Sequence, residues 1–269
     1  MLEDNHEDII AKAMRGKNIG KSMLAEKSGI KKEKIEAILD GEILEGIIMK
    51  IAPILKLDTE KLLASARKDW TPDLIEMNSV KKFESTFGSM TVNTYVVFDE
   101  STRNAWIFDT GTECNSLISF IEEENLKVDA IFLTHTHRDH IYCLDQLRST
   151  LGYPIVYVHK SEQIQNTFPI DESFENSIGE ISLKALHTHG HSIGGITYLI
   201  SGLPNPLAVV GDALFAGSMG GGMVSYQDAL RTNRDKIMTL PDETIICPGH
   251  GPMSSIAEEK RFNAFFPEF

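Results

Sequence analysis

The chain has 269 residues and a formal net charge of −13, and its 42% apolar and 24% charged residues are ordinary for a globular protein. A chain of this length can bury a sizeable core without disulfide bonds. Its first ten residues, MLEDNHEDII, lack the basic start and apolar stretch of a signal peptide, and no apolar run approaches the roughly 20 residues of a membrane span. We therefore expect a cytoplasmic protein that does not enter a membrane.

The charge distribution indicates which partners the chain suits, and the cysteine content indicates its compartment. Residues 1–70 carry 13 basic and 13 acidic residues, so the whole net charge of −13 falls on residues 71–269. Such an acidic segment is unsuited to neutralising nucleic acid phosphates. Cys114, Cys143 and Cys247 are an odd number of thiols, far apart and without a CxxC pair, which indicates reduced cysteines in a reducing compartment.

Residues 1–70 show the spacing of amphipathic helices throughout. Apolar residues recur three and four positions apart, and no alternating strand pattern occurs. Short turn signals divide the segment into helices that would form a small all-α bundle. Because Pro72 discourages helix at Thr71, we place the boundary between a first domain at residues 1–70 and a second at 71–269.

From residue 80 onward, strands alternate with helices, and some strands are joined as hairpins. Apolar and β-branched runs predict strands at 91–99, 104–111, 128–135, 154–159, 180–187, 195–201, 206–212 and 243–250. Helical spacing predicts helices at 115–125, 140–152 and 226–240. This mixture is typical of an α/β (α+β) class in which helices lie outside the sheets.

Four of these strands end in residues that bind metal ions. The strand ends carry HTHRDH at 135–140, HTHGH at 187–191, Asp212 and His250. Strand ends are where α/β proteins mount functional groups. Imidazole and carboxylate without thiolate favour zinc, iron or manganese over a closed structural cysteine site. Because these candidates outnumber the ligands of one tetrahedral ion, we predict two ions that share a bridging carboxylate.

The order of these motifs resembles the metallo-β-lactamase fold. His-x-His-x-Asp-His is followed by THGHS at 188–192, GDALF at 211–215 and CPGHG at 247–251. The resemblance covers about residues 80–269. It is closest to the glyoxalase II-like branch, through GDALFAGS and the run from residue 240 to residue 266. It implies a four-layer αββα sandwich, which here follows the helical bundle.

The resemblance also implies a role for each ligand residue. The first ion would be held by His135, His137 and His191, and the second by Asp139, His140 and His250. Asp212 would bridge the two ions. Asp139 would also orient the attacking water, and Asp109 in FDTG would support the ligand shell through hydrogen bonds. We expect two divalent ions, with zinc first and iron or manganese as alternatives.

Such a centre suits hydrolysis of a small thioester or related acyl ester. Divalent ions make hydroxide available at neutral pH and stabilise the charge that develops on a carbonyl oxygen. The resemblance implies a hydroxyacylglutathione hydrolase-like enzyme with a metal-bridging hydroxide. Two alternatives stay open. One is a mononuclear iron enzyme similar to persulfide dioxygenase, which needs only His135, His191 and Asp212; the other is a DNA-binding regulator with a metal-dependent sensing domain.

Two departures from the glyoxalase II-like pattern bear on the substrate. The Arg-Thr-Asp that often follows this motif is replaced by MGGGMVSY at 219–226, which suggests a mobile loop. The C-terminal helical domain of full glyoxalase II has no counterpart before Phe269. Tyr226, beside the loop, and Lys260 are candidate substrate contacts.

Residues 18–64 resemble the Cro/repressor-type helix-turn-helix domain. LAEKSGI at 24–30 matches its second helix and turn, and KKEKIEAILDG at 31–41 matches its recognition helix. On that helix, Lys31, Lys32 and Lys34 would face DNA. However, the helix lacks residues for bidentate base contacts, the second domain is acidic, and Pro53 is expected to interrupt the fourth helix. We therefore favour a bundle reused for domain packing or homodimerisation over one that binds nucleic acid.

Overall fold

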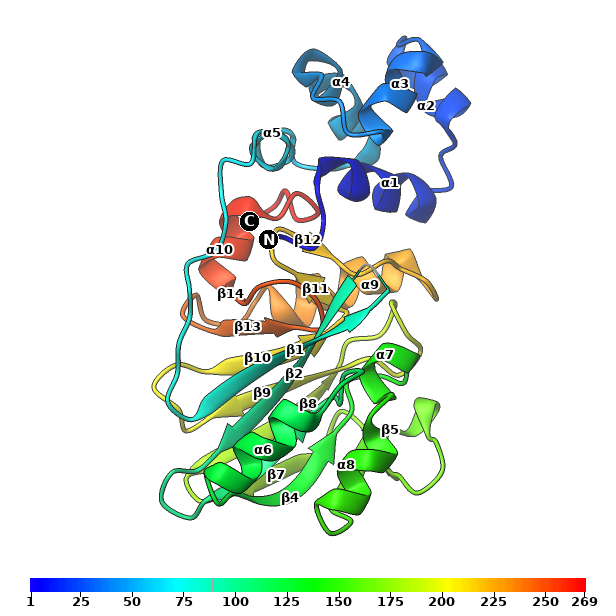
Figure 1. The fold of residues 1–269 in the computed structure, drawn as a ribbon. Coiled ribbons are helices and arrows are strands. Elements are labelled where there is room, and N and C mark those ends of the chain that lie inside the picture. The colour runs from blue at the N-terminus through cyan, green and yellow to red at the C-terminus, as the bar shows by residue number, and fades with distance from the viewer. Residues whose placement is uncertain (89) are drawn as a thin grey trace.

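The computed structural model describes residues 1–88 and 90–269. Two six-stranded sheets pack face to face, and helices cover their outer faces (Figure 1). The predicted αββα sandwich, preceded by a helical bundle, is therefore confirmed. Within the described residues, no helix combines the length and apolarity needed to cross a membrane.

The bundle consists of five helices. They are α1 (His6–Gly16), α2 (Lys21–Ser28), α3 (Lys32–Leu39), α4 (Glu45–Leu55) and α5 (Thr59–Arg67). The prediction that Pro53 interrupts the fourth helix is wrong, because Pro53 lies in the last turn of α4. Proline lacks the N–H that would bond to the carbonyl four residues earlier. That carbonyl belongs to Met49, a residue that is 54% exposed.

The first sheet has the strand order β1-β2-β3-β4-β5-β6. Its strands are β1 (Val80–Phe87), β2 (Met90–Phe98), β3 (Asn104–Phe108), β4 (Lys127–Phe132), β5 (Ile155–His159) and β6 (Phe168–Ile170). The connections from β3 to β5 contain α6 (Asn115–Glu123), α7 (Arg138–Ile141) and α8 (Leu144–Thr150), and the three strands run parallel. Apolar side chains of α6 and α8 cover the outer face of the sheet. The single helix predicted at 140–152 is thus replaced by two short ones.

The second sheet has the strand order β14-β13-β10-β9-β8-β7. Its strands are β7 (Glu175–Ile178), β8 (Ile181–His187), β9 (Ile196–Ser201), β10 (Leu207–Gly211), β13 (Ile245–Pro248) and β14 (Ser254–Ser255). Strands β11 (Leu214–Phe215) and β12 (Ser218–Met219) form a separate short hairpin. On the outer side lie α9 (Tyr226–Thr232), continued by a π-helical turn at Asn233–Ile237, and α10 (Ile256–Phe262).

Aromatic side chains fill the space between the two sheets. Phe108 and Phe132 of the first sheet meet Tyr198 of the second, Trp106 packs edge-on against both phenylalanines, and all four are fully buried. The rings of Phe132 and Tyr198 lie 5.2 Å apart, and the Tyr198 hydroxyl donates to the carbonyl of Leu133 at 2.8 Å. Because this hydroxyl is satisfied at the end of β4, the core also fixes the point where the histidine motif begins.

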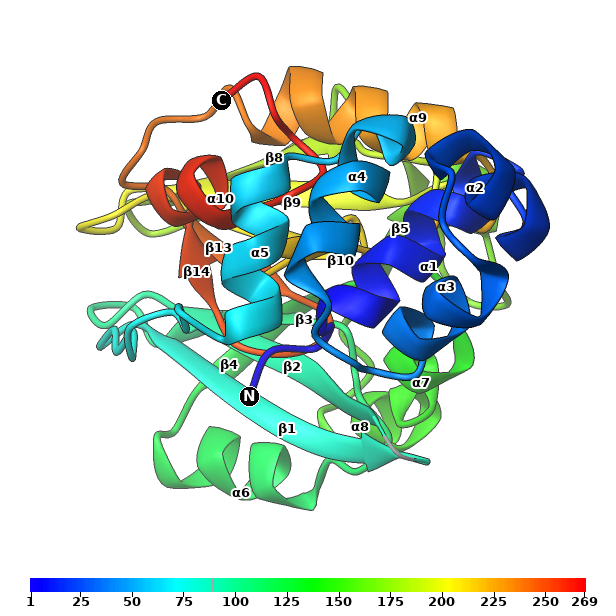
Figure 2. The same ribbon diagram turned by 90° about the horizontal axis from the view of Figure 1, so that it is seen from above.

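The bundle and the sandwich share one hydrophobic core. Leu62 and Leu63 of α5 belong to the same buried cluster as Phe265, Phe266 and Tyr226. Figure 2 shows α5 lying beside α10, which it contacts, and Figure 1 shows α1 above α9. The chain after α5 is also packed, since Trp70 stacks on Phe262 with 4.5 Å between ring centroids. The boundary predicted at residue 70 therefore follows the last bundle helix, but apolar packing continues across it.

A buried carboxylate links α10 to the start of β12. Glu259 is fully buried and accepts hydrogen bonds from the Ser254 hydroxyl at 2.7 Å, the Gly217 N–H at 3.1 Å and the Asn263 amide at 2.8 Å. Burial raises the pKa of Glu259 to about 7, although these donors favour its charged form.

The raised pKa of Glu259 predicts a pH-dependent stability. The folded state binds this proton more tightly than the unfolded chain, where the pKa is near 4.5, so the free energy of unfolding should fall as the pH rises from about 4.5 to about 7. Glu259→Gln cannot ionise and should lose this part of the pH dependence. Urea unfolding of both proteins at pH 5 and pH 7.5 measures the difference; parallel pH profiles would contradict the prediction.

Candidate metal centre

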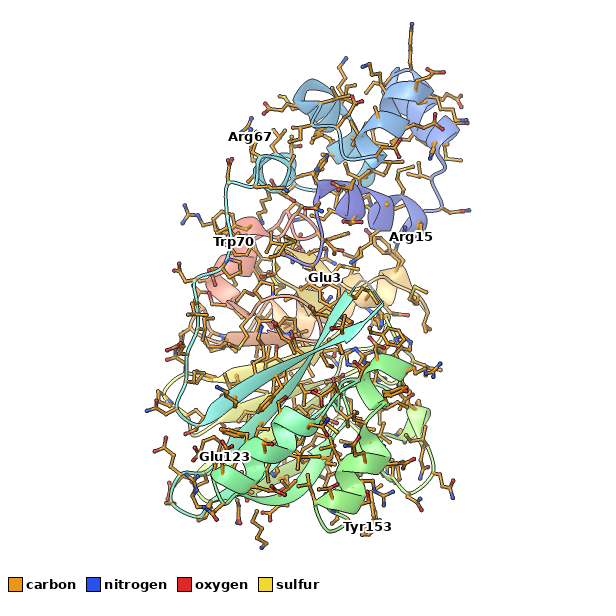
Figure 3. All side chains as sticks on the ribbon, viewed as in Figure 1. Glu3, Arg15, Arg67, Trp70, Glu123 and Tyr153 are labelled. Atoms are coloured by element: carbon orange, nitrogen blue, oxygen red, sulfur yellow. The ribbon has the colours of Figure 1, made fainter. Side chains whose placement is uncertain are left out.

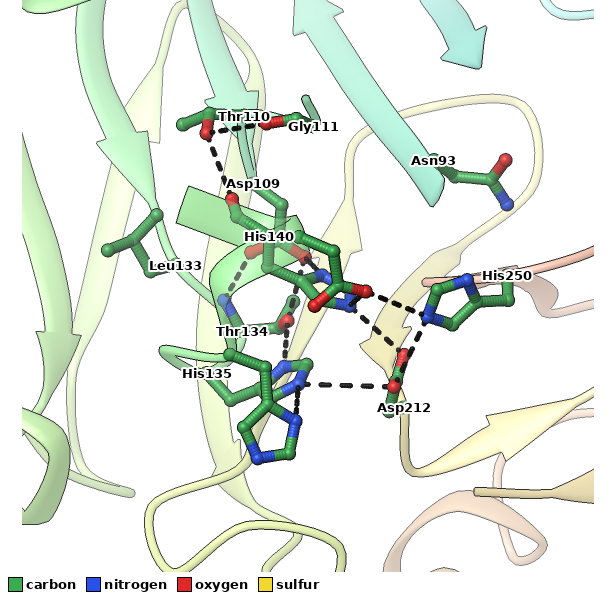
Figure 4. Close-up of polar contacts among 12 residues, drawn as sticks. Asn93, Asp109, Thr110, Gly111, Leu133, Thr134, His135, His140, Asp212 and His250 are labelled. Atoms are coloured by element: carbon green, nitrogen blue, oxygen red, sulfur yellow. Dashed lines mark hydrogen bonds and ion pairs between the residues drawn. The ribbon is translucent and has the colours of Figure 1, made fainter. Parts of the chain in front are cut away.

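One edge of the sandwich collects the ends of four strands from the two sheets. The segment HTHRDH follows β4, which lies parallel to β3, and Asp212 and His250 follow the parallel strands β10 and β13. The loop between β8 and β9 adds His191. Because parallel neighbours present their carboxyl ends at the same edge, these side chains meet there, and Figure 4 shows His135, His140, Asp212 and His250 together.

The structure brings all seven predicted ligands together in two groups. The first ligand group is His135, His137 and His191, and the second ligand group is Asp139, His140 and His250. Within each group, one ligand atom from each residue lies within 4.8 Å of the others, and Asp212 meets the same criterion with the first group.

The first ligand group converges on one point. The Nδ1 atom of His137 lies 3.0 Å from the Nε2 atom of His135 and 3.0 Å from that of His191. Zinc–nitrogen bonds of about 2.0–2.1 Å in a tetrahedral site place ligand nitrogens roughly 3.3 Å apart. The observed spacing is close to that value. His135 is buried while His137 is exposed, so the group opens to solvent on the His137 side.

The Asp212 carboxylate faces both ligand groups. Its Oδ2 atom lies 3.3 Å from the Nε2 atom of His191 and 3.4 Å from that of His250. Its Oδ1 atom lies 3.3 Å from the Nε2 atom of His140. A carboxylate in this position can bind two ions at once, which fits the bridging role that the sequence predicts.

In three histidines, the ring nitrogen that points away from the centre, Nδ1, contacts an oxygen atom. The Nδ1 atom of His191 contacts the Gly221 carbonyl at 2.9 Å, and that of His250 contacts the Thr91 carbonyl at 2.6 Å. In the same way, Nδ1 of His140 contacts Asp109 Oδ2 at 2.8 Å. Since a carbonyl can only accept, Nδ1 of His191 and of His250 carries a proton, and in the neutral ring that binds metal the lone pair of Nε2 would point inward.

Two buried atoms in the middle of the centre also indicate a metal site. Among residues 1–88 and 90–269, neither His140 Nε2 nor Asp212 Oδ1 has a hydrogen-bond partner. Leaving buried polar atoms unpaired is costly, and the two face each other at 3.3 Å. A divalent ion would satisfy both, so the residues present fit a metal centre.

The electrostatics of the centre also favour a cation. Burial lowers the pKa of His135 and of His191, which keeps both imidazoles neutral and able to bind metal. Burial also opposes charge on His140 and His250, but nearby carboxylates, chiefly that of Asp212, outweigh it and raise the pKa of His140 to about 10 and of His250 to about 11. The second ligand group therefore lies in a strongly negative field.

Asp109 connects the end of β3 to the centre. Its carboxylate accepts from the Thr134 N–H at 2.7 Å and the Thr134 hydroxyl at 2.7 Å, besides contacting His140. Its φ of 57° lies in the left-handed region, which aspartate and asparagine tolerate better than most residues. This geometry matches the supporting role that the sequence predicts for Asp109.

Sequence reasoning missed Glu162. Its carboxylate accepts from the Thr136 N–H at 2.6 Å and from the Gly194 N–H at 2.8 Å, and so ties the histidine motif to the loop that carries His191. The only available signal was its position just after the predicted strand at 154–159. The Gly221 and Thr91 carbonyls were also missed, because a backbone acceptor leaves no trace in the residue type.

The other predicted contact residues are buried against the bundle, paired on the surface or exposed. Tyr226 is 6% exposed and packs against α1, where a Cβ on Gly16 would lie 2.1 Å from its ring. Lys260 is paired with Asp242 at 2.6 Å. The lysines of the expected recognition helix are all exposed, namely Lys31, Lys32 and Lys34. Roles for these five residues in substrate or DNA binding stay predictions.

Comparison with known proteins identifies the family. Residues 88–250 match the Metallo-beta-lactamase superfamily. The chain belongs to that superfamily. A probable metallo-hydrolase of Bacillus subtilis, YqgX, is 32% identical over 208 residues, which are 68% of this chain and 95% of that protein. The hydroxyacylglutathione hydrolase GloC of Haemophilus influenzae is 32% identical over 198 residues, covering 64% and 92%.

One solved structure that is similar to this chain contains iron. The crystal structure of TTHA1623 in a di-iron-bound form is 26% identical, with a TM-score of 0.56, and covers 68% of this chain and 99% of that one. The superfamily match begins at residue 88, so it leaves the helical bundle outside.

Asp109 offers a test of the centre that leaves every predicted ligand in place. Asp109→Asn keeps the size and the tolerance of positive φ but removes the charge that holds His140 Nδ1. We expect metal affinity to fall by about 10- to 100-fold, as for other supporting partners of metal ligands. Chelator competition measures it. Asp99→Asn is the matched control, because Asp99 is a buried aspartate that accepts hydrogen bonds from Ser101 and Thr102 in a turn; equal affinity losses would contradict the role of Asp109.

Proposed function

We propose that the chain is a binuclear metal-dependent hydrolase that acts on a thioester or related acyl ester. The observation that carries the proposal is the Asp212 carboxylate, which lies within 3.4 Å of histidines from both ligand groups. The likeness to a hydroxyacylglutathione hydrolase over most of that protein's length supports the substrate class.

Each part of the chain's own chemistry has a role in this proposal. Bound divalent ions would lower the pKa of a water molecule and polarise the substrate carbonyl. Asp139 keeps 11% of its side chain exposed and lies 3.3 Å from His250 Nε2, so its carboxylate can orient that water and accept its proton. The exposed His137 marks the side from which an acyl carbon would approach.

Zinc is the proposed metal, because all seven ligands are imidazole or carboxylate and zinc accepts both at low coordination number. The same ligands suit iron, which the di-iron relative contains. Elemental analysis of purified protein separates the alternatives. Two zinc ions per chain favour the hydrolase, whereas one iron per chain favours the mononuclear oxygenase.

The substrate class is tested with a panel of thioesters. Metal-loaded protein should hydrolyse S-lactoylglutathione or another member of the panel, followed by release of free thiol. His137→Ala and Asp212→Ala each remove a ligand, so turnover should fall to background together with metal content. A metal-free Asp212→Ala protein that kept full activity would overturn the mechanism.

A further inference from the structure

The first residues of the chain reach the edge of the sandwich that holds the metal centre. Figure 3 labels Glu3 between the bundle and the strands. A Cβ on Gly251, the residue after the ligand His250, would lie 3.2 Å from the Cβ atom of Glu3. The N-terminal segment therefore packs against the residue next to a ligand, although the superfamily match does not cover it.

A buried ion pair anchors this segment to the glycine loop, which we define as residues 217–222. Asp4 pairs with Lys12 of α1, and their side chains are only 8% and 12% exposed. The carboxylate of Asp4 also accepts from the Ser218 hydroxyl at 2.6 Å, and the Lys12 ammonium donates to the Met219 carbonyl at 2.9 Å. A buried pair is favourable only when its remaining donors and acceptors are satisfied, and here the loop satisfies them.

The other side of the glycine loop touches the metal ligands. Its Gly221 carbonyl accepts from Nδ1 of His191 at 2.9 Å. At Gly220, a Cβ would lie 1.7 Å from the Asp212 carbonyl and 3.2 Å from His191 Nδ1, so the loop is pressed against both ligands. In the loop at residues 219–226, Met219 and Gly220 are buried, whereas Met223 and Val224 are 76% and 58% exposed.

The same lysine reaches the second ligand group through an aromatic ring. The Lys12 ammonium lies 4.9 Å from the centroid of Phe215, and the ring of Phe215 meets that of His250 edge-on at 5.7 Å. Lys12 is therefore linked to His191 through the glycine loop and to His250 through the ring of Phe215.

We propose that Asp4 and Lys12 are positioning residues of the metal centre. Their ion pair holds the glycine loop where the Gly221 carbonyl orients His191, so the helical bundle is a structural part of the centre. This inference rests on the metal centre and does not depend on the thioester substrate.

Metal affinity of the full chain tests the inference without any substrate. Lys12→Met and the double variant Asp4→Asn/Lys12→Met should each bind Zn²⁺ about 10-fold more weakly in chelator competition, since they loosen a partner of a ligand. The double variant leaves no buried charge unpaired and so guards against simple unfolding. Ser218→Ala removes one hydroxyl from the same network and should change affinity in the same direction. The absorption spectrum of the Co²⁺-loaded variants should shift as well, because it reports ligand geometry.

Lys61→Met is the matched control. Lys61 is another buried bundle lysine, and its ammonium donates to the Phe266 and Phe269 carbonyls rather than to the glycine loop. This variant should lower the melting temperature and keep native Zn²⁺ affinity. Native affinity in the Lys12 and Ser218 variants, or an equal loss in Lys61→Met, would mean that the ion pair only docks the bundle and would overturn the inference. Absence of thioester hydrolysis would affect the proposed function alone.

Discussion

The architecture of this edge depends on one buried carboxylate surrounded by imidazoles. Asp212 is 7% exposed, and isolated burial of its charge would be prohibitive. Gly211, at the end of β10, makes the position possible: its φ is 53°, and a Cβ there would lie 2.4 Å from the Thr134 hydroxyl. The two sheets can therefore approach closely enough for histidines of both to face Asp212. Because the strand ends approach each other, the seven ligand side chains can meet at this edge. Because three of the histidines point their Nε2 atoms inward, their Nδ1 atoms need oxygen acceptors on the other side.

The ligands could be read from the sequence because metal binding restricts residue type, and because strand ends bring such residues to one edge. The groups that orient them could not. Gly221 acts through a backbone carbonyl, which the residue type does not reveal. Glu162 cannot be told from the other glutamates in the sequence, because only the turn after β5 places its carboxylate against the histidine motif. Local patterns also failed where tertiary context prevailed. Helical spacing at 140–152 ran through the break between α7 and α8, and Pro53 is tolerated in the last turn of α4, where the residue that loses its donor, Met49, is exposed.

The packing of the bundle bears on which of its two predicted roles the structure favours. Its helices α2 and α3 keep the lysines of the expected recognition helix exposed, while α1 and α5 turn their apolar sides toward Tyr226 and Phe266. A freely tethered module would instead bury its apolar residues among its own helices. The shared core favours the packing role over an independent domain, and it leaves the α3 surface as the part on which the nucleic acid hypothesis depends.

The shared core has a consequence for the order in which the protein can be made. The bundle leaves the ribosome before the sandwich, yet the sandwich side chains that share its core lie between residues 208 and 266. The apolar surface of the bundle therefore stays exposed to solvent while nearly two hundred residues are synthesised. We expect a chaperone to bind the nascent bundle during that time. The contacts that complete it join the two ends of the chain, which makes closure of this interface a late and slow event in folding.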